Sequence, residues 1–338
     1  MASQSTPGGR GAASSSTPEL LDLTIDNITQ NTNVINSQAP SARLRYVMER
    51  LVTHLHDFAR ETRLSTEEWM AAIKFLIATG QISDDKRNEF ILLSDVLGLS
   101  LLVDNVNHPT PPGCTEGSVL GPFHTHDAPT LANGESMTSD PEGEPMLAVC
   151  TVKDRDGNPL AGVKVDIWET DSGGHYDVQH RDKDGPSERC VMISDDQGRF
   201  WFRGIKPVSY PIPNDGPVGK LLERLGRHCW RPAHVHFMFE KEGWEKLITA
   251  LYLRGDPYEK TDAVFGVKSS LTIDLDKVDA ATSSEYGVPE GTWLLRRDFV
   301  LVTEEETSKL RDDKAVEALK KLGLKVRLED HLPVPDLD

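Results

Sequence analysis

The sequence predicts a mainly β protein with added α-helix, in which an N-terminal helical domain precedes an antiparallel β-sandwich. Three observations lead to this fold class. Between Leu20 and Asn107, apolar side chains recur every three or four residues, the period of amphipathic helices. From Met146 onward, short β-branched runs alternate with turn signals, as in sandwich proteins. The chain has 338 residues, 38% of them hydrophobic, which suffices for one large or two medium cores.

Changes in composition divide the chain into four parts. Residues 1–18 are rich in Gly, Ser, Thr and Pro and contain no apolar run, so we expect a disordered leader and not a secretory signal. Residues 19–108 form the helical domain, and residues 109–306 form the β-sandwich domain. Residues 307–338 hold a last amphipathic helix and an acidic tail.

Three helices are expected in the helical domain. The first presents one apolar face, made of Leu44, Val47, Met48, Leu51, Val52, Leu55 and Phe58. The second begins with a capping box between Ser65 and Glu68, and Gly80 is expected to end it as a C-cap. The third corresponds to "EFILLSDVLGLSLLVDNV" and is expected to be a single helix buried on most sides.

The β domain is predicted from a series of short runs separated by turns. Val163, Val165 and Ile167 alternate along "AGVKVDIWET", which follows the turn "DRDGNPL". The other expected strands are "MLAVCTV", "RFWFRGI", "AHVHFMF", "KLITALYL" and "RDFVLV".

Composition argues against several classes of protein. The chain carries 37 Lys and Arg against 54 Asp and Glu, a net charge of −17 with no basic cluster, so nucleic acid and anionic membrane surfaces are not expected partners. The four cysteines form no CxxC pair, which argues against a disulfide framework and a thiolate zinc site. No apolar run is long enough to span a bilayer, so we expect a soluble cytoplasmic protein.

One strand contains two histidines in "GRHCWRPAHVHFMF". Side chains at positions i and i+2 of a strand share a face, so His234 and His236 lie side by side while Val235 faces away. Such imidazoles can be hydrogen-bonded core groups, pH-responsive contacts or metal ligands. The pair does not choose a metal, and zinc would require a further His, Cys or carboxylate.

Two of the six tyrosines occupy unusual contexts. Tyr176 lies in "DSGGHYDVQ", after a strand that ends in a Gly-Gly loop, and Tyr210 lies in the proline-rich "KPVSYPIPNDGPVG". Each could serve only in packing, but rigid loops also hold side chains for chemistry.

The segment "YPIPNDGPVGKLLERLGRHCWRPAHVHF" resembles the intradiol ring-cleaving dioxygenases, which are non-haem Fe(III) enzymes of catechol catabolism. The resemblance extends to "SVLGPF", "EFILLSDVLGLSLLVD" and "DPYEKTDAVFGVKSSL", and covers roughly residues 40–300. It implies a β-sandwich catalytic domain and a helical domain that forms a homodimer. Family members can also hold a lipid between these helices, although no residue of this chain requires one.

Matched to the family motif, the iron ligands would be Tyr176, Tyr210, His234 and His236, with one Fe(III) per subunit. Ferric iron strongly lowers the pKa of a phenol, so both tyrosines can bind as phenolates. Two phenolates and one hydroxide balance the triple charge, which avoids a net buried charge. By the same match, Tyr210 leaves the metal when a diol binds and takes one of its protons.

Arg231 precedes the first histidine by three residues. In an acidic chain it could form a surface ion pair. The matching arginine of the family lies beside the substrate ring, where a fixed cation stabilises negative charge during the reaction. The resemblance therefore implies a catalytic role for Arg231.

Within the family, "VLGPF" and "DAVFGVK" are similar to hydroxyquinol 1,2-dioxygenases. The matching substrate-pocket residues are Leu92, Asp95, Val119, Gly121, Pro122, Phe123, Ile212, Pro213, Arg231 and Val264. A carboxylate in an apolar pocket needs a partner, and for Asp95 this could be a third ring hydroxyl or a group of the helical domain. Catechol-specific members often carry a glutamine at the position of Ala250.

The predicted function is therefore an intradiol dioxygenase that uses Fe(III) and O2 to cleave hydroxyquinol (1,2,4-trihydroxybenzene) to maleylacetate. The nearest alternative is the same chemistry on catechol, which gives cis,cis-muconate. Two alternatives from other classes are a non-catalytic β-sandwich binding module and a zinc hydrolase that uses the two histidines.

Overall fold

The computed structural model describes residues 22–84, 87–180 and 185–336. The leader predicted for residues 1–18 lies outside the described residues. The chain forms two compact units, Met1–Ala72 with Lys314–Asp338 and Ile73–Asp313. The domain boundaries expected from the sequence, after residues 18, 108 and 306, differ from these limits and remain predictions.

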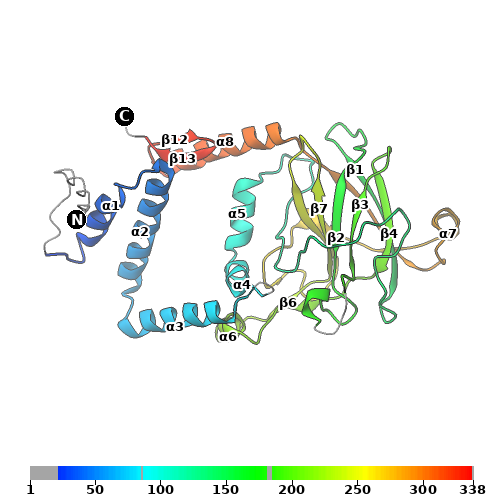
Figure 1. The fold of residues 1–338 in the computed structure, drawn as a ribbon, viewed down its shortest axis with the longest axis horizontal. Coiled ribbons are helices and arrows are strands. Elements are labelled where there is room, and N and C mark those ends of the chain that lie inside the picture. Colours follow the sequence, from blue (N-terminus) through cyan, green and yellow to red (C-terminus); the bar gives the residue numbers. More distant parts are fainter. Residues whose placement is uncertain (1–21, 85–86, 181–184, 337–338) are drawn as a thin grey trace, which may run out of the picture. The chain divides into compact units, whose positions relative to one another are not determined.

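The smaller unit is built on two helices and a C-terminal hairpin (Figure 1), which are α1 (Ile28–Asn36), α2 (Ala42–Thr62), β12 (Val326–Glu329) and β13 (Leu332–Pro335). Ser41 caps α2 by accepting a hydrogen bond from the N–H of Leu44 at 3.2 Å. Arg43 of α2 donates to the carbonyl of Pro333 at 2.7 Å, which ties the hairpin to the helix. The expected acidic tail is thus largely a β-hairpin.

The apolar face predicted for α2 exists, but it is exposed. Of its seven residues only Val52 is buried, and Leu55 and Phe58 keep more than half of their surface, 55% and 53%. An exposed apolar stripe of this kind marks an interaction surface.

Helix α3 (Thr66–Ile82) confirms the capping box and corrects the predicted end. The N–H of Ser65 donates to Glu68 at 2.9 Å, and the N–H of Glu68 donates to the Ser65 hydroxyl at 3.1 Å. The prediction that Gly80 ends the helix was wrong, because the helix continues to Ile82. The hydroxyl of Ser83 satisfies the carbonyl of Thr79 beyond that end.

The prediction of a single buried helix was also wrong for the segment "EFILLSDVLGLSLLVDNV". It is two helices, α4 (Glu89–Val96) and α5 (Leu99–Asn107), separated by Gly98 in the left-handed conformation at φ 74°. The side chains of Leu92 and Asp95 are buried, but many apolar side chains of the two helices are exposed: Phe90, Ile91, Leu99, Leu102, Val103 and Val106.

Two sheets form the sandwich of the larger unit. The first has the order β3-β2-β7-β8-β9, with β3 (Arg189–Ile193), β2 (Lys164–Trp168), β7 (His234–Glu240), β8 (Leu247–Leu253) and β9 (Thr272–Ile273). The second has the order β10-β11-β1-β4, with β10 (Asp276–Lys277), β11 (Trp293–Val300), β1 (Pro145–Lys153) and β4 (Arg199–Ile205). Pairing is antiparallel except between β1 and β11 and between β8 and β9, which are parallel.

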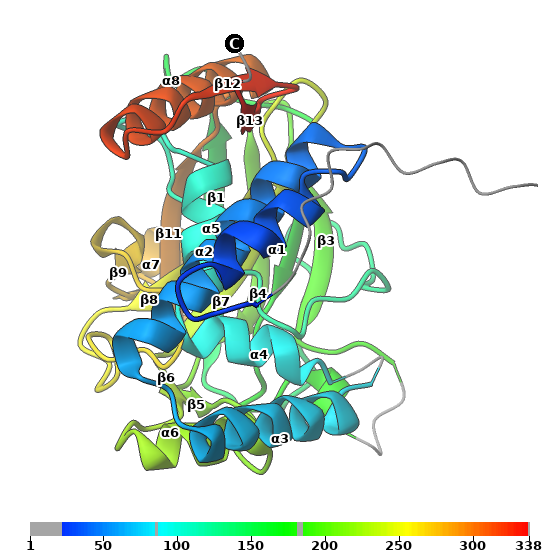
Figure 2. The same cartoon turned by 90° about the vertical axis from the view of Figure 1, so that its left-hand side faces the viewer.

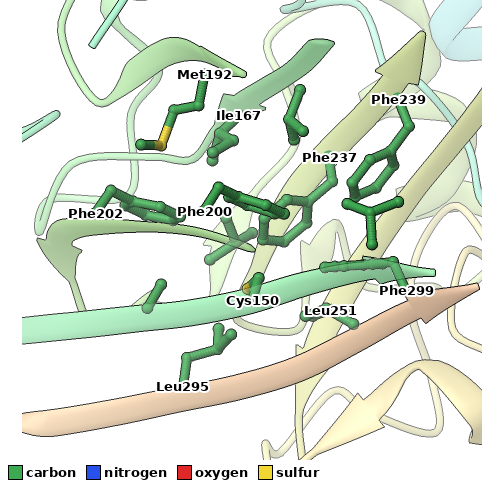
Figure 3. Packing of buried hydrophobic residues seen from close by; sticks show 14 of the residues in the cluster. Cys150, Ile167, Met192, Phe200, Phe202, Phe237, Phe239, Leu251, Leu295 and Phe299 are labelled. Carbon is green, nitrogen blue, oxygen red and sulfur yellow. The ribbon is translucent and has the colours of Figure 1, made fainter. Parts of the chain in front are cut away.

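The core lies between these sheets and is rich in phenylalanine (Figure 3). The rings of Phe239 and Phe299 have centroids 4.6 Å apart, and those of Phe237 and Phe299 are 5.0 Å apart. Val235, Phe237 and Phe239 point inward from β7, so His234 and His236 occupy its other face.

Shorter elements complete the larger unit, namely η1 (Asp177–Gln179), β5 (Tyr210–Pro211), α6 (Pro217–Arg224), β6 (Trp230–Arg231), η2 (Ser269–Leu271) and α7 (Ala280–Tyr286). Strands β5 and β6 pair with each other, and α4 packs against α5 and α6 (Figure 2). Helix α8 (Glu304–Lys321) crosses the boundary between the units. The four cysteines are all described and all free. Among the described residues, no helix is long and apolar enough to cross a membrane.

Candidate active site

The outer face of β7 brings the two predicted histidines together. His236 pairs with Trp168 of β2, and their rings stack in parallel with centroids 4.8 Å apart. The Nε2 atoms of His234 and His236 are 3.0 Å apart. His234 Nδ1 lies 2.6 Å from the carbonyl of Pro232, which can only accept, so Nδ1 carries the proton and Nε2 carries the lone pair.

The two predicted tyrosines meet at the same place. Tyr210 of β5 pairs with Arg231 of β6, and its hydroxyl lies 3.1 Å from that of Tyr176. Tyr176 precedes η1 and is fixed by Gln179, whose side chain accepts its N–H at 2.8 Å. Gly174 allows this loop to approach, because an added Cβ would lie 3.0 Å from the Cβ of Tyr210. Both tyrosines are buried.

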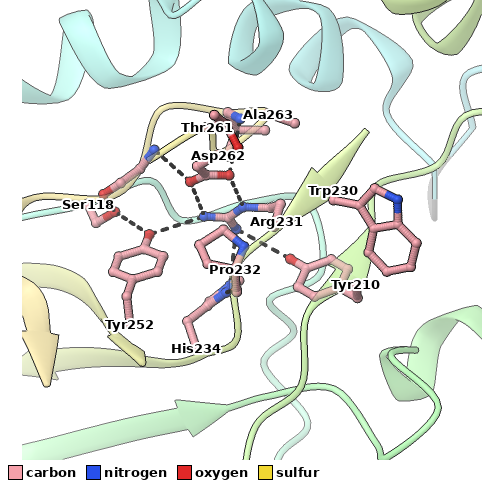
Figure 4. A network of polar contacts seen from close by, with 12 residues as sticks. Ser118, Tyr210, Trp230, Arg231, Pro232, His234, Tyr252, Thr261, Asp262 and Ala263 are labelled. Atoms are coloured by element: carbon pink, nitrogen blue, oxygen red, sulfur yellow. Dashed lines mark hydrogen bonds and ion pairs between the residues drawn. The ribbon is translucent and has the colours of Figure 1, made fainter. Parts of the chain in front are cut away.

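Arg231 connects this cluster to a network of polar groups (Figure 4). Its Nη1 lies 3.3 Å from the Tyr210 hydroxyl and 3.1 Å from His234 Nε2. On its other side, Nε and Nη2 donate to the two oxygens of Asp262 at 3.1 and 3.3 Å. Arg231 is therefore not the surface ion pair that the sequence left open, since it is buried and paired with a buried carboxylate.

Burial and charge set the protonation of these groups. Burial, followed by the charge of Arg231, lowers the pKa of His234 to about 3, and burial with His234 lowers that of His236 well below its usual value. Burial raises the pKa of Tyr176 well above its usual value. Burial alone would raise the pKa of Asp262, but Arg231 outweighs it and the pKa is lowered. Without a cation, the imidazoles and Tyr176 are thus neutral.

Most of the predicted pocket residues surround the cluster. Leu92, Val119, Phe123, Ile212 and Val264 are buried in one apolar group with both tyrosines. The ring of Phe123 stacks on Tyr176 at 4.7 Å. Three further pocket residues are only partly buried, and each is a close neighbour of a buried one along the chain: Gly121, Pro122 and Pro213.

Asp95 is also buried, with 3% of its surface exposed. Burial raises its pKa, and a side-chain hydrogen bond with Ser100 and the charge of Arg231 act in the opposite direction. Asp95 therefore has a partner within the helical region, as one of the two sequence-based alternatives expected. Its electrostatic coupling to Arg231 also links it to the site.

Sequence reasoning missed three residues of the network. The Tyr252 hydroxyl accepts from Arg231 Nη2 at 3.1 Å and lies 3.0 Å from the Ser118 hydroxyl, which donates to the carbonyl of Gly266 at 2.8 Å. Burial raises the pKa of Tyr252 to about 12, so it remains a phenol. Strand pairing opposes Tyr252 to His234, but the sequence alone does not reveal that β7 and β8 are neighbours in this register. Asp262 begins the motif "DAVFGVK", but the sequence did not show that it pairs with Arg231.

The four predicted ligands fit a single metal ion. Two neutral imidazoles turn their Nε2 atoms toward each other, and two phenol oxygens converge beside them, all from buried side chains. Imidazole nitrogens and phenol oxygens can bind a cation, and phenol with imidazole donors suits a ferric ion. The fold and the cluster thus define a β-sandwich protein with a buried group of oxygen and nitrogen donors that could hold a metal ion.

Comparison with known proteins identifies the family. Residues 119–302 match the family described as "Dioxygenase", and residues 41–115 match "Catechol dioxygenase N terminus". The chain is 63% identical over 321 residues to the intradiol ring-cleavage dioxygenase hqdA of Aspergillus niger, covering 95% of this chain and 98% of that one. It therefore belongs to the intradiol ring-cleavage dioxygenases and is an enzyme of that class; the family depends on non-haem iron.

Two further relatives share most of the chain. The hydroxyquinol 1,2-dioxygenase of Rhizobium sp. is 45% identical over 262 residues, which are 77% of this chain and 89% of that one. The structure of hydroxyquinol 1,2-dioxygenase from Pseudomonas putida is 40% identical with a TM-score of 0.78, covering 83% of this chain and 99% of that one. The predicted combination of helical and β-sandwich regions is confirmed by this likeness.

Proposed function

We propose that this enzyme cleaves hydroxyquinol to maleylacetate, inserting both atoms of O2, with one Fe(III) per subunit held by Tyr176, Tyr210, His234 and His236. The observation that carries the proposal is the grouping of four buried donors. The Nε2 atoms of the two histidines lie 3.0 Å apart, the two tyrosine hydroxyls lie 3.1 Å apart, and the rings of Tyr210 and His234 join the two pairs with centroids 5.4 Å apart. When bound, Fe(III) would supply the Lewis acidity and the electron-accepting capacity that make a chelated diol reactive toward O2.

Tyr210 is the proposed proton acceptor for the incoming diol. Its hydroxyl is the one that Arg231 reaches, at 3.3 Å, whereas no hydrogen bond joins Arg231 to Tyr176. As a ligand of Fe(III), Tyr210 would be a phenolate, and it could then receive a proton from a substrate hydroxyl at close range. Tyr176 stays in place, since Phe123 and Gln179 hold its ring and its backbone.

Arg231 is the proposed stabiliser of negative charge on the reacting ring. Its guanidinium is buried and held by Asp262 and Tyr252, so its position is fixed before substrate arrives. A preorganised charge in a site that excludes water acts without reorganisation during the reaction.

Asp95 supports hydroxyquinol as the substrate. It is a buried carboxyl group, and the predicted pocket residues Leu92, Val119 and Val264 are buried and apolar. A buried carboxylate is stabilised by each further hydrogen bond that it accepts. The third hydroxyl of hydroxyquinol could donate such a hydrogen bond, and catechol lacks it. Relatives named hydroxyquinol 1,2-dioxygenase, at 40–45% identity, support the same choice.

Oxygen uptake with a panel of diols tests the substrate. We expect a higher kcat/KM for hydroxyquinol than for catechol, and the product should be maleylacetate. A catechol preference of about tenfold or more, equivalent to about 1.4 kcal/mol in the transition state, would favour the catechol alternative and cis,cis-muconate as product.

The colour of the protein tests the ligand set separately. Tyrosinate bound to Fe(III) absorbs visible light, so the iron-loaded enzyme should be wine-red, and Tyr176→Phe and Tyr210→Phe should each shift or weaken this absorption. A protein that stays colourless with stoichiometric iron would exclude these tyrosines as ligands. Stoichiometric zinc without oxygen uptake on any diol would instead indicate a hydrolase.

We also propose a homodimer formed through the helical region. The apolar face of α2 supports it, because Leu51 and Leu55 are 47% and 55% exposed. Sedimentation of the wild type and of a Leu51→Glu, Leu55→Glu variant tests it: the variant should be monomeric. A monomeric wild type would overturn the proposal. Cytoplasmic location and lipid binding remain predictions from the sequence.

A further inference from the structure

A second group of metal-binding side chains lies in the loop between β2 and η1. Asp171, His175 and His180 each offer one ligand atom, and these atoms all lie within 4.8 Å of one another. None of the three belongs to the tyrosine and histidine cluster described above. Their donors, one carboxylate oxygen and two imidazole nitrogens, form a set that divalent transition metals use widely.

The carboxylate of Asp171 is oriented by the loop itself. Its Oδ1 accepts the backbone N–H groups of Gly173 and His175, both at 3.0 Å. The other oxygen, Oδ2, lies 2.7 Å from His180 Nε2. Hydrogen bonds to the second oxygen of a ligating carboxylate are a regular feature of metal sites, because they hold the first oxygen in position.

The two histidines are brought to this carboxylate by the short helix η1. His180 follows η1, and its N–H donates to the carbonyl of Asp177 at 3.0 Å. The rings of His175 and His180 lie 5.6 Å apart. Gly173 lies close to both groups, since an added Cβ would lie 3.3 Å from Asp171 Oδ1 and 3.4 Å from His175 Nδ1.

We propose that Asp171, His175 and His180 form a second metal site, which binds a divalent transition metal such as Zn²⁺. A calcium or magnesium ion would be a poor fit, because these ions prefer oxygen ligands alone. His175 is exposed and Asp171 is buried, so the ion would bind at the surface, with water in its remaining positions. None of its three residues is a proposed iron ligand, so this proposal does not rest on the proposed function.

Occupancy of this site would affect the neighbouring active site through the chain. His175 is joined directly to Tyr176, and Gln179, which holds the Tyr176 backbone, is joined to His180. A metal that bridges His175 and His180 would therefore restrain the turn that presents Tyr176.

Titration of the iron-loaded enzyme with Zn²⁺ tests the site. Calorimetry and metal analysis after gel filtration should find one zinc per chain in addition to the iron. His175→Ala and His180→Gln should each weaken zinc binding at least about tenfold. The glutamine can still donate to Asp171, so this variant keeps the loop contact. His228→Ala, which removes a histidine bonded to Thr261 elsewhere, is the matched control and should bind zinc normally.

Three results would overturn the proposal. One is the absence of stoichiometric zinc beyond the iron, which would leave the Asp171–His180 contact as a hydrogen bond only. Another is unchanged zinc binding in both variants. The third is loss of iron and colour in the His175 and His180 variants while the Tyr176 and Tyr210 variants keep both, which would identify this group as the iron site. That third result would also refute the proposed function, whereas the first two would not affect it.

Discussion

The two faces of strand β7 are equally buried and chemically opposite. Val235 and Phe237 point into the sandwich with no exposed surface, and His234 and His236 on the other face are only 2% and 1% exposed. The inner face is held by packing among aromatic rings. The outer face is held by hydrogen bonds and ring contacts to Pro232, Arg231 and Trp168. Burial alone therefore does not distinguish a core residue from a ligand; the partners do.

This difference has a consequence for mutants. The inner face contributes apolar transfer and packing energy, so its loss should lower the free energy of unfolding. The outer face holds buried polar groups, which cost free energy to remove from water but provide the proposed metal donors. Substitution of its histidines should therefore lower turnover. Substitutions on adjacent residues of one strand should thus separate stability from activity.

The largest effect is expected for the outer face. His236→Ala should lower kcat/KM for hydroxyquinol at least about 10³-fold, about 4 kcal/mol in the transition state, because a proposed ligand is lost. Measurements are oxygen uptake and iron content. Val235→Ala, one residue away on the inner face, is the matched control and should keep iron and turnover per folded molecule. Turnover within tenfold of wild type in His236→Ala would contradict the ligand assignment.

The next effect belongs to the inner face. Phe237→Ala should lower the free energy of unfolding by about 3–5 kcal/mol, because it leaves a cavity among Phe200, Phe239 and Phe299. Urea unfolding measures this, and the visible absorption of the folded fraction should be retained. Phe237→Leu fills part of the cavity and should cost less. Equal losses in both variants would argue against a cavity as the cause.

A smaller effect on turnover is expected for Asp262, which holds Arg231 beside the outer face of β7. Asp262→Asn should lower kcat about 10- to 100-fold, because Arg231 loses the charge that holds it beside Tyr210. Asp262→Glu should recover part of the loss. Asp274→Asn removes an exposed partner of Arg254 and should leave kcat unchanged. A change in KM alone would indicate that Asp262 acts on substrate binding and not on the position of Arg231.

The smallest effect concerns selectivity. Asp95→Asn should reduce the preference for hydroxyquinol over catechol about tenfold, since a hydrogen bond between a charged group and a hydroxyl contributes about 1.5–3 kcal/mol. The ratio of the two kcat/KM values measures this, and the visible absorption should be unchanged. An unaltered ratio would mean that Asp95 serves only its contact with Ser100.

Local patterns predicted much of the fold. The alternation in residues 163–167 and 234–239 predicted strands, and the capping box at Ser65 predicted the start of α3. The end of α3 and the break at Gly98 were missed, because a glycine can continue a helix or end it, and only its surroundings decide which. For α2 the sequence left open whether the apolar face forms a dimer contact or packs on its own sandwich, because an apolar stripe does not state what covers it.

The sequence by itself determined which side chains could serve as ligands. Strand periodicity put His234 and His236 on one face, and the family motif singled out Tyr176, Tyr210 and Arg231. Only the tertiary structure decided that Tyr252 and Asp262 hold Arg231, and that Asp171, His175 and His180 converge, because such contacts join segments whose register or loop path is set by the folded chain. Side-chain alternation along a strand can be read directly from the sequence, because it depends only on neighbouring positions. Contacts between distant segments cannot, because they depend on how the chain folds.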